Sequence, residues 1–139
     1  MKTDIQRVLV TGLDARLPAL RQAQANAQKP ARGWLRAVRS ALGLSQPQVA
    51  GKIPMTRQSY EGLEVAEQRG VISLNSLQRA AEAMDCDLVY FVVPREQVAQ
   101  TYGELAQRHD PDFEHLQASE HSMALEDQAV GDVAGKKKP

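Results

Sequence analysis

Two helix-start signals, Ser45 and Thr56, constrain the fold of this chain more than any other feature of its sequence. Ser45 and Gln48 form the Ser-x-x-Gln pattern of a capping box, and Pro47 is tolerated because the first helical turn needs no amide donor. Thr56 opens a second helix eleven residues after Ser45. This interval holds one short helix and a turn of about three or four residues, which predicts a helix-turn-helix.

The apolar residues around these signals recur at helical spacing. A preceding helix is expected from Trp34 to Leu42, and Gly43 is typical of a helix end. In that helix Trp34, Leu35, Val38 and Leu42 form the apolar stripe, and the expected buried positions of the two motif helices are Val49, Ala50, Ile53, Tyr60 and Leu63. The fold class is therefore expected to be mainly α, with a core of about four helices.

Composition bounds the class of protein. The chain has 139 residues, of which 42% are hydrophobic and 24% charged, and this is the composition of a globular domain with some appended length. No apolar run approaches the roughly 18 residues of a membrane helix, and residues 1–5 lack the apolar core of a signal peptide. The single cysteine, Cys86, excludes an intramolecular disulfide framework and a cysteine-rich zinc site. A cytoplasmic protein is expected.

Charge is distributed unevenly along the chain, although the formal net charge is zero. Residues 1–42 carry eight Lys or Arg and two Asp, whereas residues 95–139 carry five basic and nine acidic residues. Such asymmetry favours a polyanion partner at one end and a different partner at the other. The plain alternative is an unevenly charged solvated surface.

Breaker residues divide the chain into four parts. Residues 1–32 are expected to hold a helix, over about 11–27, and a basic linker. Residues 33–94 are expected to form the helix-turn-helix domain with a dimerising strand. Residues 95–130 are expected to be a partly helical acidic extension, and 131–139 a disordered tail.

The motif resembles a known family. The residues on which the resemblance rests are Leu44, Ser45, Gln46, Val49, Ala50, Ile53, Thr56, Arg57, Gln58, Ser59, Tyr60, Leu63 and Glu64. They resemble the phage-repressor type of helix-turn-helix, the XRE family. Pro54 stands where that family usually has Gly in the turn, and because Pro cannot adopt a positive φ, this turn must take another shape.

A narrower resemblance covers almost the whole chain. The segments Arg32–Arg39, Ile72–Leu77, Asp85–Tyr90 and Ser122–Glu126 look like the bacterial family called mobile mystery protein A. Such proteins are typically encoded beside a Fic-domain protein. The resemblance therefore implies the antitoxin-like or regulatory half of a two-gene module, in the bacterial cytoplasm and on the nucleoid when bound to DNA.

The second helix of the motif is expected to read DNA in the major groove, where base edges carry an unambiguous donor and acceptor code. Arg57 offers a two-pronged donor for guanine, and Gln58 offers an amide for adenine. The expected base-reading residues are Arg57, Gln58, Glu61 and Gly62. The expected DNA-backbone contacts are Gln46, Thr56, Ser59, Arg36, Lys29 and Arg32. A solvated helix face is the plain alternative for these polar residues.

Two of the polar residues have more specific expectations. Gln46 resembles the family's phosphate-clamping glutamine. Arg39 and Glu64 are expected to form a partly buried ion pair that ties the helix before the motif to the end of the recognition helix.

The run Leu88, Val89, Tyr90, Phe91, Val92 and Val93 is typical of a strand buried on both faces. A lone strand leaves its amide groups unpaired. We expect it to pair antiparallel with the same strand of a second subunit, since a homodimer suits a reader of palindromic operators. The competing partner is the strand-like run Ile5–Val10 of the same chain.

Other constellations give weaker signals. His109, His115 and His121 recur every six residues, so on a helix they spread around the axis and do not converge on a metal. Ser122 and Glu126 resemble the motif with which Fic proteins and their antitoxins obstruct the nucleotide site, although an ordinary helix end explains them as well. No catalytic spacing or nucleotide fingerprint is present, so neither an enzyme nor a cofactor is expected.

The sequence therefore predicts a homodimeric, sequence-specific repressor that binds double-stranded DNA and regulates its own operon, and the family resemblance implies a Fic-domain protein as its partner. The alternative is a protein-interaction module that neutralises a toxin without reading DNA. A weaker alternative is a binder of the DNA backbone alone, whose affinity falls with salt equally for all sequences.

Overall fold

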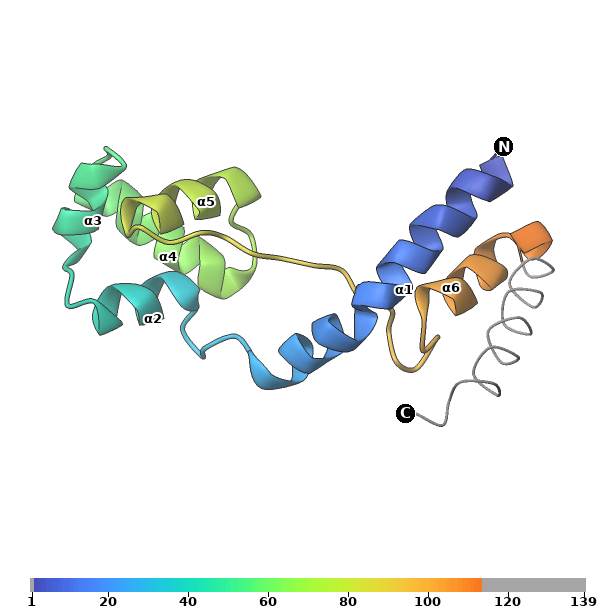
Figure 1. The fold of residues 1–139 in the computed structure, drawn as a ribbon. Helices are drawn as coiled ribbons and strands as arrows, with labels where there is room; N and C mark the ends of the chain where they lie inside the picture. Colours follow the sequence, from blue (N-terminus) through green and yellow to red (C-terminus); the bar gives the residue numbers. More distant parts are fainter. Residues whose placement is uncertain (1, 114–139) are drawn as a thin grey trace. The chain divides into compact units, whose positions relative to one another are not determined.

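The computed structural model describes residues 2–113, and within them the expected mainly helical class is confirmed (Figure 1). The helices are α1 (Lys2–Asn26), α2 (Trp34–Ala41), α3 (Gln46–Lys52), α4 (Arg57–Arg69), α5 (Leu74–Ala83) and α6 (Tyr102–His109). A further helical turn starts at Pro111 and includes Phe113, the last described residue. None of the described helices combines the length and the hydropathy that crossing a membrane requires.

The described residues belong to two compact units. One unit comprises residues 26–91 and contains α2 to α5. The other comprises residues 2–25 together with 92–113, so it joins α1 to α6. From the sequence, α1 and α6 were expected in separate parts, 1–32 and 95–130, because local patterns carry no signal of contacts between residues so far apart along the chain.

The core of the unit 26–91 forms where α3 packs against α4 and α5. Its buried members are Leu35, Val49, Ala50, Tyr60, Ala80 and Met84. The other expected core positions, Val38, Ile53 and Leu63, are partly buried at its edge. Trp34 and Leu42, on the same expected helix, remain about half exposed, so α2 buries a narrower face than its apolar pattern suggested.

Both predicted helix starts are confirmed. The Ser45 Oγ atom accepts from the Gln48 amide at 3.3 Å, and the Gln48 side chain accepts from the Ser45 amide at 2.7 Å, which completes the capping box. The Thr56 Oγ1 atom caps α4 by accepting from the Ser59 amide at 3.0 Å. Between the two helices the Ile53–Pro54 peptide bond is cis, and none of residues 53–55 has a positive φ.

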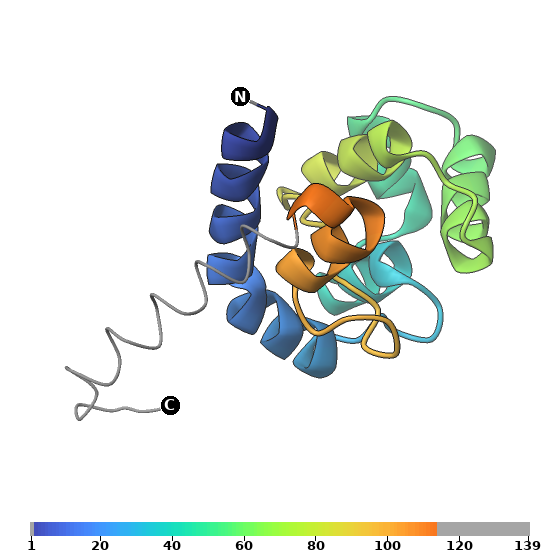
Figure 2. The ribbon, with the colours of Figure 1, turned by 90° about the vertical axis from the view of Figure 1, so that its right-hand side faces the viewer.

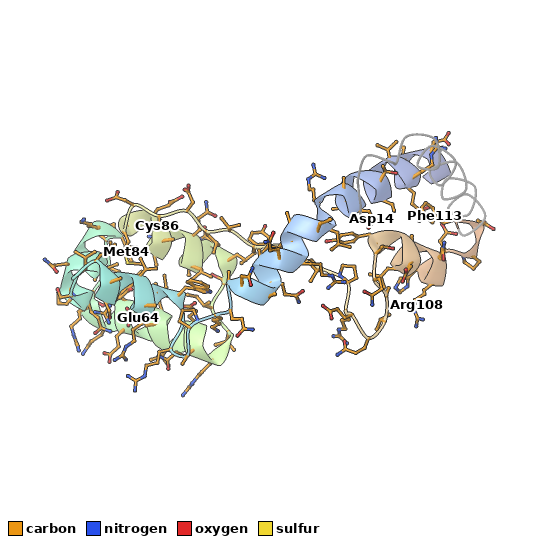
Figure 3. All side chains as sticks on the ribbon, turned by 60° about the horizontal axis from the view of Figure 1, so that its bottom comes forward. Asp14, Glu64, Met84, Cys86, Arg108 and Phe113 are labelled. Carbon is orange, nitrogen blue, oxygen red and sulfur yellow. The ribbon has the colours of Figure 1, made fainter. Side chains whose placement is uncertain are left out.

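In the other unit, α1 and α6 lie side by side (Figure 2). The Asp14 carboxylate of α1 (Figure 3) accepts from the backbone amides of Tyr102 at 2.7 Å and Gly103 at 3.1 Å. The N-cap of α6 is Thr101, whose Oγ1 atom accepts from the Glu104 amide at 3.0 Å, so the two side chains together satisfy the first turn. Leu17 and Phe113 are buried in this unit.

The structure corrects the expected beginning of the N-terminal helix. α1 begins at Lys2, and the run Ile5–Val10 is helical, so it is not an intrachain strand partner for residues 88–93. The β-branched residues in this run suggested a strand, but Ile5, Leu9 and Leu13 also continue a four-residue helical spacing toward Leu17. Continuity with the longer helix outweighs the weak local strand preference.

The expected strand 88–93 is absent from the described chain. Residues 86–95 are neither helix nor strand, and no backbone–backbone hydrogen bond joins residues 87–93 to other described residues. Val89 and Val92 are 78% and 79% exposed, so the run is not buried on both faces within one chain. Pairing with a second copy stays a prediction.

Candidate nucleic-acid interface

The N-terminal half of α4 exposes the four residues that were expected to read bases. They are Arg57, Gln58, Glu61 and Gly62. The opposite face of the same helix is held in the core, where Tyr60 and Glu64 are buried. This division follows from helical spacing, since a helix that buries one stripe presents the residues between to solvent.

Arg57 and Glu61 lie one turn apart on the exposed face. Their side chains are about half exposed, and Arg57 Nη2 lies 3.7 Å from Glu61 Oε1. An ion pair this exposed is weak, so it leaves the guanidinium available to a stronger acceptor. The Glu61 carboxylate repels phosphate but can accept a hydrogen bond from cytosine N4 in the major groove.

Thr56 and Ser59 stand where α4 begins. Besides its capping bond, the Thr56 hydroxyl donates to Ser59 Oγ at 2.9 Å. The Ser59 hydroxyl therefore keeps its own proton for an acceptor such as a phosphate oxygen. Phosphate is also favoured there by the positive end of the α4 dipole.

The Gln46 side chain is held by a hydrogen bond to α4. Its Nε2 atom donates to Glu64 Oε1 at 3.2 Å. An amide nitrogen carries two protons, so one remains for a phosphate while the other orients the side chain.

The three expected basic contacts differ in their surroundings. Lys29 Nζ donates to the Glu67 carbonyl oxygen at 3.1 Å, whereas the side chains of Arg32 and Arg36 are exposed. All three belong to the same unit as α4. Residues 26–91 carry eight Lys or Arg and six Asp or Glu. Glu64 is paired with Arg39 away from solvent and Glu67 is buried, so seven basic and four acidic residues remain on this unit.

The predicted ion pair between Arg39 and Glu64 is confirmed. Arg39 Nε donates to Glu64 Oε2 at 2.6 Å, and Arg39 Nη2 donates to Oε1 at 3.2 Å. Arg39 Nη1 also donates to the Leu44 carbonyl oxygen at 3.1 Å. The side chains are 15% and 5% exposed, so this bidentate pair links α2, the segment before α3, and α4 with little access for water.

The network shifts the ionisation of its members. Burial alone would raise the pKa of Glu64, but the hydrogen bonds to its carboxylate, above all from Arg39, bring that pKa below its ordinary value. The hydrogen bond to Glu64 raises the pKa of Arg39. Burial raises the pKa of the Tyr60 hydroxyl, which has no hydrogen-bond partner of good geometry among the described residues.

Sequence reasoning missed Glu67. Its buried carboxylate accepts from the backbone amides of Trp34 at 2.8 Å and Leu35 at 2.9 Å, and so caps α2 from α4. Two signals pointed to it. The residue before α2 is Gly33, which has no side chain to cap the helix, and Glu67 continues the buried stripe of α4 after Tyr60 and Glu64.

Ser122 and Glu126, together with His115 and His121, lie outside the described residues. Across residues 2–113, no group of three or more His, Cys, Asp or Glu side chains is placed to hold a metal ion. No family model, no curated protein and no solved structure matches the chain.

Proposed function

We propose that the protein is a sequence-specific DNA-binding repressor whose α4 enters the major groove. The observation that carries this proposal is the exposed face of Arg57, Gln58 and Gly62 on a helix whose other face is fixed in the core. A helix reads bases only if its scaffold holds its side chains in one place. The Arg39–Glu64 pair and the Thr56 cap supply that rigidity.

The finer assignment rests on the resemblance to the XRE proteins and to mobile mystery protein A. In this proposal the protein regulates its own operon as the antitoxin-like partner of a Fic-domain protein. The acidic residues of 95–139 suit a basic protein surface better than DNA. Ser122 and Glu126 are the proposed inhibitory contacts with that partner.

The proposed repressor is a homodimer in which residues 88–93 of two copies pair antiparallel. Val89, Tyr90 and Val92 are at least 66% exposed, and the backbone of this run makes no backbone–backbone hydrogen bond with other described residues. The Val92 carbonyl oxygen accepts from the Tyr102 hydroxyl. Pairing with the same run of a second copy would satisfy the other backbone groups and create the two-fold symmetry of a palindromic operator.

The test is fluorescence anisotropy at about physiological salt, where specific and non-specific affinities separate. The probes are DNA from upstream of the protein's own gene and a scrambled duplex. We expect the wild type to prefer the native duplex, and Arg57→Ala with Gln58→Ala to abolish this preference. Loss of both base contacts corresponds to roughly 2–6 kcal/mol of discrimination.

The matched control is Gln78→Ala with Arg79→Ala, which removes the same side chains from the exposed face of α5. This control should keep the native preference. Equal binding of both duplexes by the wild type contradicts base reading and favours the protein-interaction module. Equal binding with a steep salt dependence would favour the backbone-only binder.

A further inference from the structure

α1 presents two different faces. Asp14, Leu17 and Arg21 face the rest of their own unit, where Asp14 caps α6, Leu17 is buried and Arg21 Nη1 donates to the Pro94 carbonyl oxygen at 2.8 Å. The other face is apolar and exposed. Ile5, Val8, Leu9 and Leu13 are 60%, 66%, 61% and 38% exposed.

With Gly12 and Arg16, these four residues form one stripe. At about 100° per residue, the positions 5, 8, 9, 12, 13 and 16 lie on one side of the helix. A shallow depression at the N-terminal end of the stripe is lined by Asp4, Ile5, Val8 and Leu9. A contiguous apolar stripe of this kind marks an interaction site, because a helix buries such a face against another element.

The spacing of the stripe residues is the same when read from either end of the helix. Successive members are separated by three, one, three, one and three residues. A two-fold axis midway between Val10 and Thr11 therefore matches every member with another. Ile5 of one copy lies opposite Arg16 of the other, Val8 opposite Leu13, and Leu9 opposite Gly12.

This register also places a large side chain of one copy opposite a small residue of the other. Leu9 is the central large residue of the stripe, and Gly12 leaves room opposite it. A Cβ at Gly12 would meet only the Arg16 Nη1 atom of its own helix, at 3.4 Å. Glycine inside a helix costs about 1 kcal/mol relative to alanine, and it allows two helix backbones to approach closely.

Charge adds to the size match between Leu9 and Gly12 in favouring the antiparallel direction. Asp4 borders the N-terminal end of the stripe, and Arg16 occupies its C-terminal end. The Arg16 guanidinium is exposed and bonds to the Gly12 carbonyl oxygen at 3.0 Å. An antiparallel copy places each Arg16 beside the other Asp4, whereas a parallel copy places like charges together.

We infer that α1 pairs antiparallel with α1 of a second copy of this chain, with the axis between Val10 and Thr11. This interface is separate from residues 88–93, and it requires no DNA. In the pair, the apolar stripe of α1 is buried as well as the face that α1 turns toward its own unit.

The test is disulfide trapping in the full chain carrying Cys86→Ser. Ile5→Cys and Arg16→Cys are combined in one protein and oxidised with oxidised glutathione, which takes up the two electrons and two protons of each disulfide formed. The two positions are about 16 Å apart along one helix, too far for a bond within the chain. We expect a covalent dimer on a non-reducing gel.

Two controls accompany this variant. Thr11→Cys with Gln22→Cys has the same spacing at exposed positions off the stripe, and it should stay monomeric on the gel. Ile5→Cys alone should also stay monomeric, because the antiparallel register keeps the two copies of position 5 apart. Trapping by Ile5→Cys alone would indicate a parallel pair and overturn the inference.

Absence of trapping in the double variant would also overturn it. The reactivity of the cysteine at position 5 toward a soluble maleimide then identifies the state of the stripe. Slow labelling of a monomer would mean that residues 114–139 of the same chain cover the stripe. Fast labelling would mean that the stripe is open to solvent. The trapping must persist with Arg57→Ala and Gln58→Ala, so a failure of DNA reading leaves this result unaffected.

Discussion

Gly33 and Glu67 are fitted to each other at the start of α2. Gly33 has a φ of 93°, and a Cβ at this position would lie 2.7 Å from Glu67 Oε1. The absence of a side chain lets the Glu67 carboxylate reach the amides of Trp34 and Leu35. α2 is therefore capped by a residue of another helix, and its first turn is tied to α4.

Gly33→Ala should destabilise the protein strongly. With φ 93° and ψ 162°, Gly33 adopts a backbone conformation that only glycine adopts readily, so a Cβ there costs roughly 1–3 kcal/mol, and the contact with Glu67 adds to this cost. Urea unfolding followed by far-UV circular dichroism measures the loss. Gly43→Ala is the control, since Gly43 also has a positive φ, of 72°, but a Cβ there would meet no atom within 4 Å. Equal losses in the two variants would show that the fit to Glu67 contributes nothing.

Glu67→Ala should leave two amides at the start of α2 without an acceptor. A buried unsatisfied donor costs about 1–3 kcal/mol, so we expect a loss in that range or above it. Glu67→Gln keeps one carbonyl acceptor and should lose less. The measurement compares the urea concentrations at which the two variants are half unfolded, with Asp87→Ala, a substitution at an exposed position, as the reference. A Glu67→Gln protein as unstable as Glu67→Ala would mean that the charge, and not the acceptor, stabilises the helix start.

Local patterns in the sequence predicted the elements around α3 and α4 well. The Ser45 capping box and the Thr56 cap depend on residues three positions apart, so the sequence contains all the information needed. The Arg39–Glu64 pair was predicted from a family register that carries tertiary information. Glu67 and Asp14 were not predicted as caps because their partners lie 32 to 33 and 88 to 89 residues away along the chain.

The two apolar runs at Ile5–Val10 and 88–93 show where periodicity becomes ambiguous. A short run rich in Val, Ile and Leu fits a strand and a buried helix equally, and only its neighbours decide. Ile5–Val10 adjoins a helical pattern and is helical. Residues 88–93 stop at Pro94 and have no neighbouring strand in the described chain, so within the chain no partner holds them as a strand.

The Glu64 carboxylate should make stability dependent on acid pH. Its pKa is lower in the folded protein than its ordinary value of 4.5, so its contribution is complete above that value. The contribution falls as the pH decreases through the lower pKa of the folded state. Glu64→Gln should lose about 3 kcal/mol at pH 7, because it leaves the buried Arg39 guanidinium without its counter-charge.

The measurement is urea unfolding from pH 7 to pH 3 on the wild type and Glu64→Gln. The two curves should converge as the pH falls, because protonation removes from the wild type what the substitution has already removed. Gln68→Ala, at an exposed position on the same helix where no charge is removed, should run parallel to the wild type. A constant gap between wild type and Glu64→Gln would contradict the assigned ionisation.

Gly62→Ala should separate stability from DNA binding. Gly62 is exposed inside α4, and a Cβ there would meet no atom within 4 Å, so alanine should stabilise the helix by up to about 1 kcal/mol. If α4 lies in the major groove, the added methyl group occupies space that the bases approach, and affinity for the native duplex should fall. Gly51→Ala in α3, also exposed and with open space around it, is the control for stability without loss of base reading. Thermal unfolding and anisotropy on the same preparations test both effects, and undiminished binding by Gly62→Ala would remove Gly62 from the reading face.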